Sequence, residues 1–317
     1  MSTYLITGAS GYIGSRLSGR LLKSDEENRV VALVRDAQKA RAVLPDCAEI
    51  VQADLTDKRE MDSLNIDCDY IIHCASVTRS AEMVSHPVEV IESIVNTAQN
   101  VLELARRCSV TSMVNLSSME VYGSMDCPEG RRVSEEELGD MDILQIRSCY
   151  PMGKRMVETI CRSYWEEYKV PVKTARLAQT FGKGILPTDN RVFAQFARAA
   201  KEGKDIVLHT KGDSMGNYCG IDDAVKGILT ILYHGADGES YNVVNEENTM
   251  TIREMAELVA EKLAKGRIRI VCRIPAGNIY GYGAYTGLRL SGEKLAGLGW
   301  IPEESLEDMY RDLWECI

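Results

Sequence analysis

The sequence predicts an α/β protein with a doubly wound parallel sheet, followed by a smaller mixed α/β C-terminal domain. Short apolar runs in the first 180 residues are continuous rather than alternating, which is typical of strands buried on both faces of a parallel sheet. Longer amphipathic stretches separate these runs, as the covering helices of such a sheet would. Helical and short strand patterns mix after residue 180. We therefore divide the chain into domains 1–180 and 181–317, and expect 216–234 to pack back on the first domain.

Each element follows from its local pattern. Strands are expected at residues 4–6, 30–34, 50–51, 70–72, 112–116 and 172–177. Helical periodicity predicts helices over 12–23, 88–107, 151–168, 191–202, 222–234, 251–264 and 305–315. The polar segment 131–147 predicts a loop with a short helix. Right-handed crossovers bring the carboxyl ends of parallel strands to one edge of the sheet, so we expect a ligand there.

The composition excludes several classes of function. The chain has 317 residues, and 37 Lys and Arg against 47 Asp and Glu give a formal net charge of −10, which disfavours nucleic-acid binding. No apolar stretch approaches the roughly 18 residues of a membrane helix, and no basic region precedes the first apolar run. We therefore expect no membrane segment and a cytoplasmic protein. The ten cysteines form no CxxC pair and the four histidines lack metal-motif spacing, so we expect reduced thiols and no metal site.

A glycine-rich turn joins the first strand to the first helix. Residues 7–14, TGASGYIG, form a GxxGxxG pattern. Its first two glycines let the backbone approach a pyrophosphate, its third lets helix and strand pack closely, and the helix start attracts the anion. Because the pattern opens a βαβ array, it predicts that a dinucleotide binds at this turn. The candidate contacts are Gly8, Ser10, Gly11, Tyr12, Ile13 and Gly14.

Two further strand ends bear on which dinucleotide binds. Arg35 follows the second strand, where an Arg accommodates the 2′-phosphate of NADP and an acidic residue takes the ribose hydroxyls of NAD. We favour NADP, with NAD bound through Asp36 as the alternative. Asp54 and Leu55 follow the third strand. There, Asp54 either accepts a hydrogen bond from adenine or caps the helix that begins near Asp57.

Tyr150 and Lys154 form a YxxxK pattern, which places them four apart on one face of a helix. A phenol has a pKa near 10, so it serves as acid or base near neutrality only where a cation stabilises its phenolate, and Lys154 supplies one. Upstream, SSMEVYG (117–123) ends the fifth strand and brings Ser118 and Glu120 to the same edge of the sheet. The alternative is that the two serines are turn residues and Glu120 is a surface acid.

In this order, the motifs resemble those of extended short-chain dehydrogenases/reductases of the NAD-dependent epimerase/dehydratase family, which modify nucleotide-activated sugars. The resemblance extends nearly end to end. It includes TGASGYIG (7–14), ADL (53–55), HCAS (73–76), SSMEVYG (117–123), YPMGK (150–154), ARLAQTFG (175–182), DDAVKGI (222–228), YNVVNEE (241–247) and LGWIP (298–302). It implies a Rossmann domain for the first 180 residues.

The resemblance also implies roles for individual residues. Tyr150 would be the acid/base, Lys154 would hold the nicotinamide ribose and lower the pKa of the tyrosine, and Ser118 would hydrogen-bond the reacting oxygen. Helices 88–107 and 151–168 would form the interface of a homodimer. The remaining implied contacts are Cys74, Ala75 and Ser76 with the cofactor, and Thr78, Gln179 and Arg191 with a nucleotide-diphosphate sugar.

Departures from the family pattern bear on the reaction. Family 4,6-dehydratases resemble Thr-Asp-Glu at 118–120, but Met119 stands in the Asp position here, and a thioether cannot protonate a leaving hydroxyl. Gln179 replaces an Asn that usually contacts the nucleotide phosphates. Gly216 stands where relatives commonly carry a diphosphate-binding Arg, and Arg191 is the candidate replacement.

Three functions are compatible with these residues. Glu120 favours an epimerase/dehydratase-type enzyme that oxidises the sugar transiently and regains its cofactor. Arg35 and Met119 favour the alternative, an NADPH-dependent reductase of a nucleotide-linked keto or aldehydo sugar. A non-catalytic nucleotide-binding protein is the third, and the intact Ser118, Tyr150 and Lys154 disfavour it.

Overall fold

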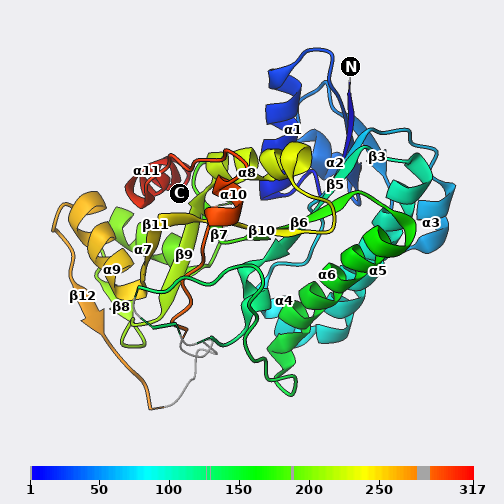
Figure 1. The fold of residues 1–317 in the computed structure, drawn as a ribbon. Coiled ribbons are helices and arrows are strands. Elements are labelled where there is room, and N and C mark those ends of the chain that lie inside the picture. Colours follow the sequence, from blue (N-terminus) through cyan, green and yellow to red (C-terminus); the bar gives the residue numbers. More distant parts are fainter. Residues whose placement is uncertain (1, 126, 129, 187–188, 277–285) are drawn as a thin grey trace.

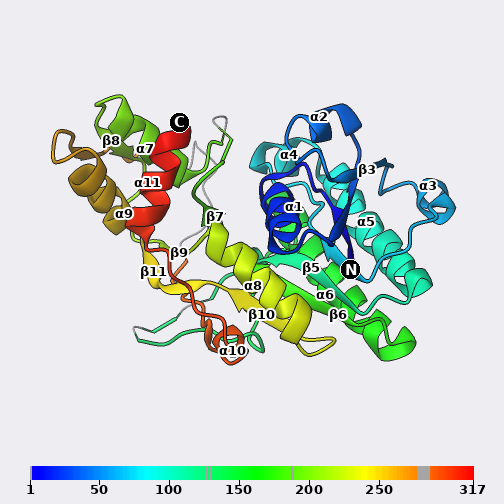
Figure 2. The same ribbon diagram turned by 90° about the horizontal axis from the view of Figure 1, so that it is seen from above.

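The chain forms two lobes (Figures 1 and 2). One contains α9 (Ile252–Leu258) and α11 (Leu306–Cys316), and the other contains α1 (Tyr12–Ser24), α3 (Lys58–Ser63) and α5 (Pro87–Cys108). The structure is a computed structural model. It describes residues 2–125, 127–128, 130–186, 189–276 and 286–317. No helix in these ranges is long and apolar enough to cross a membrane.

The larger lobe is built on a seven-stranded sheet in the order β10-β6-β5-β4-β1-β2-β3, and every neighbouring pair is parallel. The strands are β1 (Thr3–Thr7), β2 (Arg29–Val34), β3 (Glu49–Gln52), β4 (Tyr70–His73), β5 (Ser112–Ser118), β6 (Val172–Leu177) and β10 (Ser240–Val243). The chain runs outward from β1 in both directions, through β2 on one side and β4 on the other. Ligands of such sheets bind at the carboxyl ends beside this reversal.

Helices cover both faces of this sheet, which confirms the doubly wound fold. Along β1, Ile6 packs into a core with α1 and α8, whereas Leu5 packs into a second core with α5 and α6. Successive strand residues thus face different helix layers, which explains the continuous apolar runs. The helices of this lobe are α1 (Tyr12–Ser24), α2 (Ala37–Arg41), α3 (Lys58–Ser63), α4 (Ser80–Ser85), α5 (Pro87–Cys108), α6 (Cys149–Tyr168) and α8 (Ile221–His234).

The smaller lobe has its own core, in which Phe181 stacks on Phe193 with ring centroids 4.2 Å apart and Tyr310 meets Phe181 edge-on. Its sheets are β11-β9-β7, made of β11 (Asn245–Thr251), β9 (Met215–Gly220) and β7 (Gln179–Phe181), and β12-β8, made of β12 (Ile270–Cys272) and β8 (Ile206–Leu208). Its helices include α7 (Val192–Lys201), α9 (Ile252–Leu258) and α11 (Leu306–Cys316), and α10 (Glu293–Ala296) packs on β10.

Local chemistry sets several helix ends. Pro87 occupies the first turn of α5, and Ser109 ends that helix in the left-handed conformation with φ +50°. Ser305 and Asp308 form a reciprocal capping box at the start of α11. The helix predicted over 251–264 instead changes to π-helical spacing over Val259–Leu263. The spacing of apolar residues does not distinguish an α-helix from a short π-helical segment, because both keep one apolar face toward the core.

Candidate active site

The first turn of the site is built from backbone that only glycine permits. Gly8 has φ +64°, and a Cβ there would lie 2.8 Å from the backbone N and Cα of Ala75. A Cβ on Gly14 would lie 2.4 Å from the Gly8 carbonyl oxygen. The turn is closed by a 2.9 Å hydrogen bond from the Gly11 N–H to the same oxygen. The glycine turn therefore packs closely against the loop after β4 on one side and the start of α1 on the other, at the carboxyl edge of the sheet.

This turn fits the phosphates of a dinucleotide. Helix α1 has no side-chain cap and no acidic residue in its first turn, so its first N–H groups are available to an anion. Two buried hydroxyls beside it, Tyr12 Oη and Ser76 Oγ, have no hydrogen-bond partner in the described part of the chain. Buried polar groups are usually hydrogen-bonded, and the Ser76 hydroxyl follows the Cys74–Ala75 loop that contacts Gly8, so it fits a cofactor contact at this turn.

An open surface cavity of about 450 Å³ lies between the ends of β2 and β3 and helix α3, and Arg35 and Asp54 are among the residues that line it. Asp36 does not line it, because its carboxylate accepts a hydrogen bond from the Lys39 N–H at the start of α2. The Asp54 carboxylate accepts from the Thr56 N–H and hydroxyl at 2.9 and 2.7 Å, which lowers its pKa. The cap of α3 is Asp57, so the alternative that Asp54 caps this helix is wrong.

Ser118 and Glu120 lie where β5 ends. The Ser118 hydroxyl accepts a 3.2 Å hydrogen bond from the Glu120 N–H and so caps the short 3₁₀ helix Met119–Tyr122. This turn directs Glu120 outward, with its side chain about one-third exposed. Gly123 then leaves the turn with φ +65°, and a Cβ there would collide with the Asp140 carbonyl oxygen.

Tyr150 lies in the first turn of α6, 6% exposed and next to these groups. The pKa of Tyr150 is raised to about 12, mainly by burial and to a smaller extent by the Glu120 charge. A hydrogen bond with Ser118 and the positive charges of Arg147 and Arg191 act in the opposite direction. The phenol therefore faces a group of charges whose balance sets its ionisation.

Lys154 is buried one turn further along α6. Its Nζ donates a 2.8 Å hydrogen bond to the Leu116 carbonyl oxygen and lies 5.9 Å from the centroid of the Tyr150 ring. Burial lowers the pKa of Lys154 to about 8, so the ammonium form still dominates at neutral pH. The bond to β5 fixes this cation beside the phenol.

Glu120 is not a free surface acid. Arg147 donates two hydrogen bonds to its carboxylate, at 2.7 and 3.0 Å, one to each oxygen. Arg147 lies in the 3₁₀ turn Ile146–Ser148, three residues before Tyr150. Sequence reasoning missed it inside a polar loop, although its spacing of one helical turn from the YxxxK pattern is a signal.

A buried polar network lies behind the site. Arg176 pairs with Glu158, with side chains 6% and 12% exposed and a closest contact of 2.8 Å, and Glu158 also accepts from the Ser117 hydroxyl at 2.5 Å. Arg176 donates to the Tyr122 hydroxyl at 3.0 Å, and that hydroxyl donates to Asn242 at 2.7 Å. Through these bonds the network joins the end of β5 to α6, β6 and β10.

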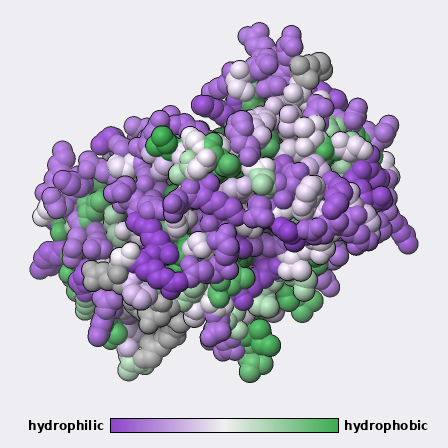
Figure 3. Space-filling view, viewed as in Figure 1, coloured by the Kyte–Doolittle hydropathy of each residue, from purple (hydrophilic) through white to green (hydrophobic). Residues whose placement is uncertain are grey.

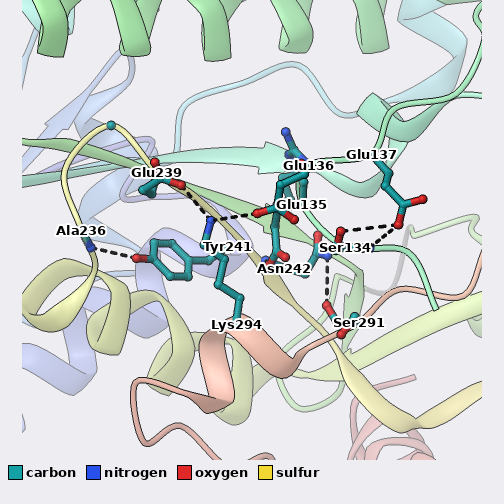
Figure 4. A network of polar contacts seen from close by, with 12 residues as sticks. Ser134, Glu135, Glu136, Glu137, Ala236, Glu239, Tyr241, Asn242, Ser291 and Lys294 are labelled. Carbon is teal, nitrogen blue, oxygen red and sulfur yellow. Dashed lines mark hydrogen bonds and ion pairs between the residues drawn. The ribbon is translucent and has the colours of Figure 1, made fainter.

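Figure 4 shows the far end of this network, where Glu135 lies beside Asn242. The buried Glu135 carboxylate accepts a 2.7 Å hydrogen bond from the Asn242 N–H, and burial raises its pKa. Lys294 approaches from α10 and pairs with Glu239 at 2.8 Å and Glu136 at 3.7 Å. The loop that follows Tyr122 is thereby tied to both β10 and α10.

The residues expected against a substrate are spread over the smaller lobe and the loop after β4. Thr78 is exposed, and Gln179 begins β7 beside Tyr218 of β9. The Arg191 guanidinium donates to both oxygens of Asp189, the closest contact being 2.7 Å. Gly216 leaves room for the Tyr218 side chain, because a Cβ on Gly216 would lie 2.2 Å from the Tyr218 hydroxyl.

The comparisons with known proteins agree with this geometry. The family model described as the NAD dependent epimerase/dehydratase family matches residues 4–245. The chain is 28% identical over 263 residues to UDP-glucuronic acid decarboxylase 1 of Danio rerio, covering 82% of this chain and 60% of that protein. It is 29% identical over 262 residues to UDP-glucuronic acid decarboxylase 5 of Arabidopsis thaliana, covering 81% and 73%. The chain thus spans about 60% of the length of the fish relative.

Solved structures share the fold over nearly the whole chain. UDP-glucose 4-epimerase of Thermotoga maritima, in complex with UDP-glucose, has a TM-score of 0.86 at 21% identity, covering 99% of this chain and 98% of that one. dTDP-glucose 4,6-dehydratase of Bacillus anthracis, in complex with NAD, has a TM-score of 0.80 at 20% identity, covering 100% and 96%. Because the family model covers most of the described sheet and its site, this chain belongs to the NAD dependent epimerase/dehydratase family.

Proposed function

We propose that this protein is an NAD(P)-dependent enzyme that modifies the sugar of a nucleotide-diphosphate sugar through a transient keto intermediate. The observation that carries the proposal is the convergence of Ser118, Tyr150 and Lys154. A buried phenol lies beside the serine at the end of β5, with a buried ammonium fixed 5.9 Å from its ring. Such a group is suited to move a proton to and from an alcohol.

The glycine turn, Ser76 and the loop Cys74–Ala75 are the proposed cofactor contacts, because this part of the site leaves helix N–H groups and a buried hydroxyl available. A bound nicotinamide dinucleotide would supply the reversible oxidation of a sugar carbon. The half-buried Cys74 thiol stays protonated here, because desolvation raises its pKa to about 12. It therefore contributes packing rather than charge.

Tyr150 would take the proton of the reacting hydroxyl and later return it. Ser118 would orient the same oxygen through its hydroxyl, which already lies against Tyr150. Lys154 would stabilise the phenolate from its fixed position on Leu116. Burial excludes water from this proton transfer, which strengthens each of these electrostatic interactions.

Glu120 would act after oxidation. A keto group acidifies the neighbouring C–H, and the Glu120 carboxylate at the strand end is the candidate acceptor of that proton. Met119 beside it offers no acid to expel a hydroxyl, so the residues favour a transient-keto reaction without loss of water over 4,6-dehydration.

The substrate class follows from the relatives, several of which are named UDP-glucuronic acid decarboxylases. We propose that residues 181–317 hold the nucleotide diphosphate, with Gln179 and Thr78 as further substrate contacts. Arg191 is the proposed diphosphate contact, which requires it to exchange the Asp189 carboxylate for phosphate.

A second candidate function is net reduction of a keto or aldehydo sugar by NADPH. It is favoured by Arg35, an exposed cation that lines the cavity beside Asp54 and suits a 2′-phosphate. We propose NADP as the preferred dinucleotide under either function.

We also propose a cytoplasmic homodimer formed through α5 and α6. These helices pack on one another and present exposed Val88, Ile91 and Met156 to solvent. Figure 3 shows a mostly hydrophilic face, with apolar side chains gathered at its lower edge, beneath α4 and α6 in the view of Figure 1. Size-exclusion chromatography with light scattering tests this association.

The reaction is tested by extracting the cofactor from the purified protein and by following a panel of UDP-glucuronate, UDP-glucose and dTDP-glucose by NMR. Tightly held NAD(P) and a product that needs no added reductant would support transient oxidation. Protein that is purified empty and consumes one NADPH per product would support net reduction instead.

A further inference from the structure

The ion pair between Glu120 and Arg147 is more than a surface contact. Both side chains are only about one-third exposed, and each oxygen of the carboxylate accepts one guanidinium hydrogen bond. An exposed pair of flexible side chains contributes little, whereas this two-point geometry fixes the orientation of the carboxylate.

Both partners are also held by their backbones. The Glu120 N–H donates to the Ser118 hydroxyl, so the serine that faces Tyr150 also sets the start of the turn that carries Glu120. Arg147 lies in the 3₁₀ turn that leads directly into α6, and the Ser148 hydroxyl of that turn donates to the Asp142 carbonyl oxygen at 2.6 Å. The pair therefore joins the end of β5 to the start of α6, the two elements that supply the reacting groups.

Several charges face the Tyr150 hydroxyl. Glu120 is negative, and Arg147 and Arg191 are positive. Glu120 raises the pKa of Tyr150 while Arg147 lowers it, so the two partners act in opposite directions on one phenol.

We propose that Arg147 is a positioning residue of this active site, which holds the Glu120 carboxylate by two hydrogen bonds and offsets its negative charge beside the Tyr150 hydroxyl. This inference rests on the proposed function for its catalytic meaning. Without Arg147, the carboxylate would turn freely and its charge would oppose formation of the phenolate. Because the charges of Glu120 and Arg147 offset each other, the Glu120 carboxylate and a Tyr150 phenolate can both be present in one site.

The test measures ionisation of Tyr150 directly. The full-length protein is labelled with [¹³Cζ]tyrosine and saturated with oxidised NAD or NADP, whichever binds more tightly, and the Tyr150 signal is identified by its loss in Tyr150→Phe. At pH 11 we expect Arg147→Gln to lower the ionised fraction of Tyr150 by about 3- to 10-fold, the effect of one uncompensated charge at short range. Glu120→Gln should raise that fraction, and the double variant should return close to wild type.

Two further variants serve as controls. Arg147→Lys keeps the positive charge but cannot donate the two parallel guanidinium hydrogen bonds to Glu120. The ionised fraction of Tyr150 in this variant should therefore be close to that of wild type, and the variant serves as a second test if Arg147→Gln folds poorly. Arg29→Gln removes an exposed ion pair with Glu49, in which both hydrogen bonds go to one carboxylate oxygen, from the amino end of the sheet; the ionised fraction of Tyr150 should not change in this variant. An unchanged Tyr150 signal in the folded Arg147 variants, or shifts of equal sign in Arg147→Gln and Glu120→Gln, would overturn the proposal. Since this readout needs no sugar turnover, its failure is separate from failure of the proposed reaction.

Discussion

Replacing Arg35 by alanine should remove most of the preference for NADP over NAD. Arg35 is exposed and lines the cavity at the ends of β2 and β3, where a 2′-phosphate would approach it. A charge-assisted hydrogen bond contributes about 1.5 to 3 kcal/mol. Exposure and the nearby Asp54 carboxylate both weaken this interaction, so we expect the lower end of that range, about 1.5 kcal/mol or roughly a tenfold loss of affinity.

The assay is calorimetric titration of wild type and Arg35→Ala with NADP and NAD at one salt concentration. NADP affinity should fall about tenfold in the variant while NAD affinity changes little. Arg41→Ala is the matched control, because Arg41 is an exposed cation on α2 that does not line the cavity. Tighter binding of NAD than NADP by both wild type and Arg35→Ala would refute the reasoning.

Three other substitutions test separate parts of the site. Tyr150→Phe should keep dinucleotide affinity and lose about 10² to 10⁴-fold in turnover, and more than about a third of wild-type turnover would exclude it as the acid/base. Gly14→Ala places a Cβ 2.4 Å from a backbone oxygen and should abolish dinucleotide binding in calorimetry, unlike Gly19→Ala, which meets nothing within 4 Å. Glu158→Gln leaves the buried Arg176 guanidinium without its carboxylate and should lower the free energy of unfolding in urea by about 3 to 5 kcal/mol. The control Glu166→Gln removes an exposed pair and should lower the free energy of unfolding by at most about 1 kcal/mol. Equal urea midpoints of the two variants would contradict this prediction.

Local patterns predicted much of the main sheet. Its apolar runs and glycine turn depend on neighbours close in sequence, so the strand at 4–6 and the helix at 12–23 fall within a residue of β1 and α1. The YxxxK spacing likewise predicted that Tyr150 and Lys154 share one face of α6. These features need only helix and strand periodicity.

Contacts between distant segments were not predictable in the same way. Glu120 meets Arg147 across a polar loop, and Arg176 meets Glu158 across the interface of β6 and α6. Nothing in the local pattern of either partner selects the other, since any acid has several candidate cations. The role of Gly216 also depends on the fold, because only the arrangement of β9 shows that the Tyr218 side chain fills the space beside it.

Transient oxidation of the sugar, with regeneration of the cofactor, is the core of the proposed function. It is tested most directly by running the reaction in deuterium oxide, with wild type and Glu120→Gln, while counting NADPH consumed per product. We expect turnover without net NADPH consumption. If the reaction breaks the C–H beside the keto group, deuterium should appear on that carbon in wild type and not in Glu120→Gln. One NADPH consumed per product, with no carbon-bound deuterium from solvent in either protein, would contradict transient oxidation.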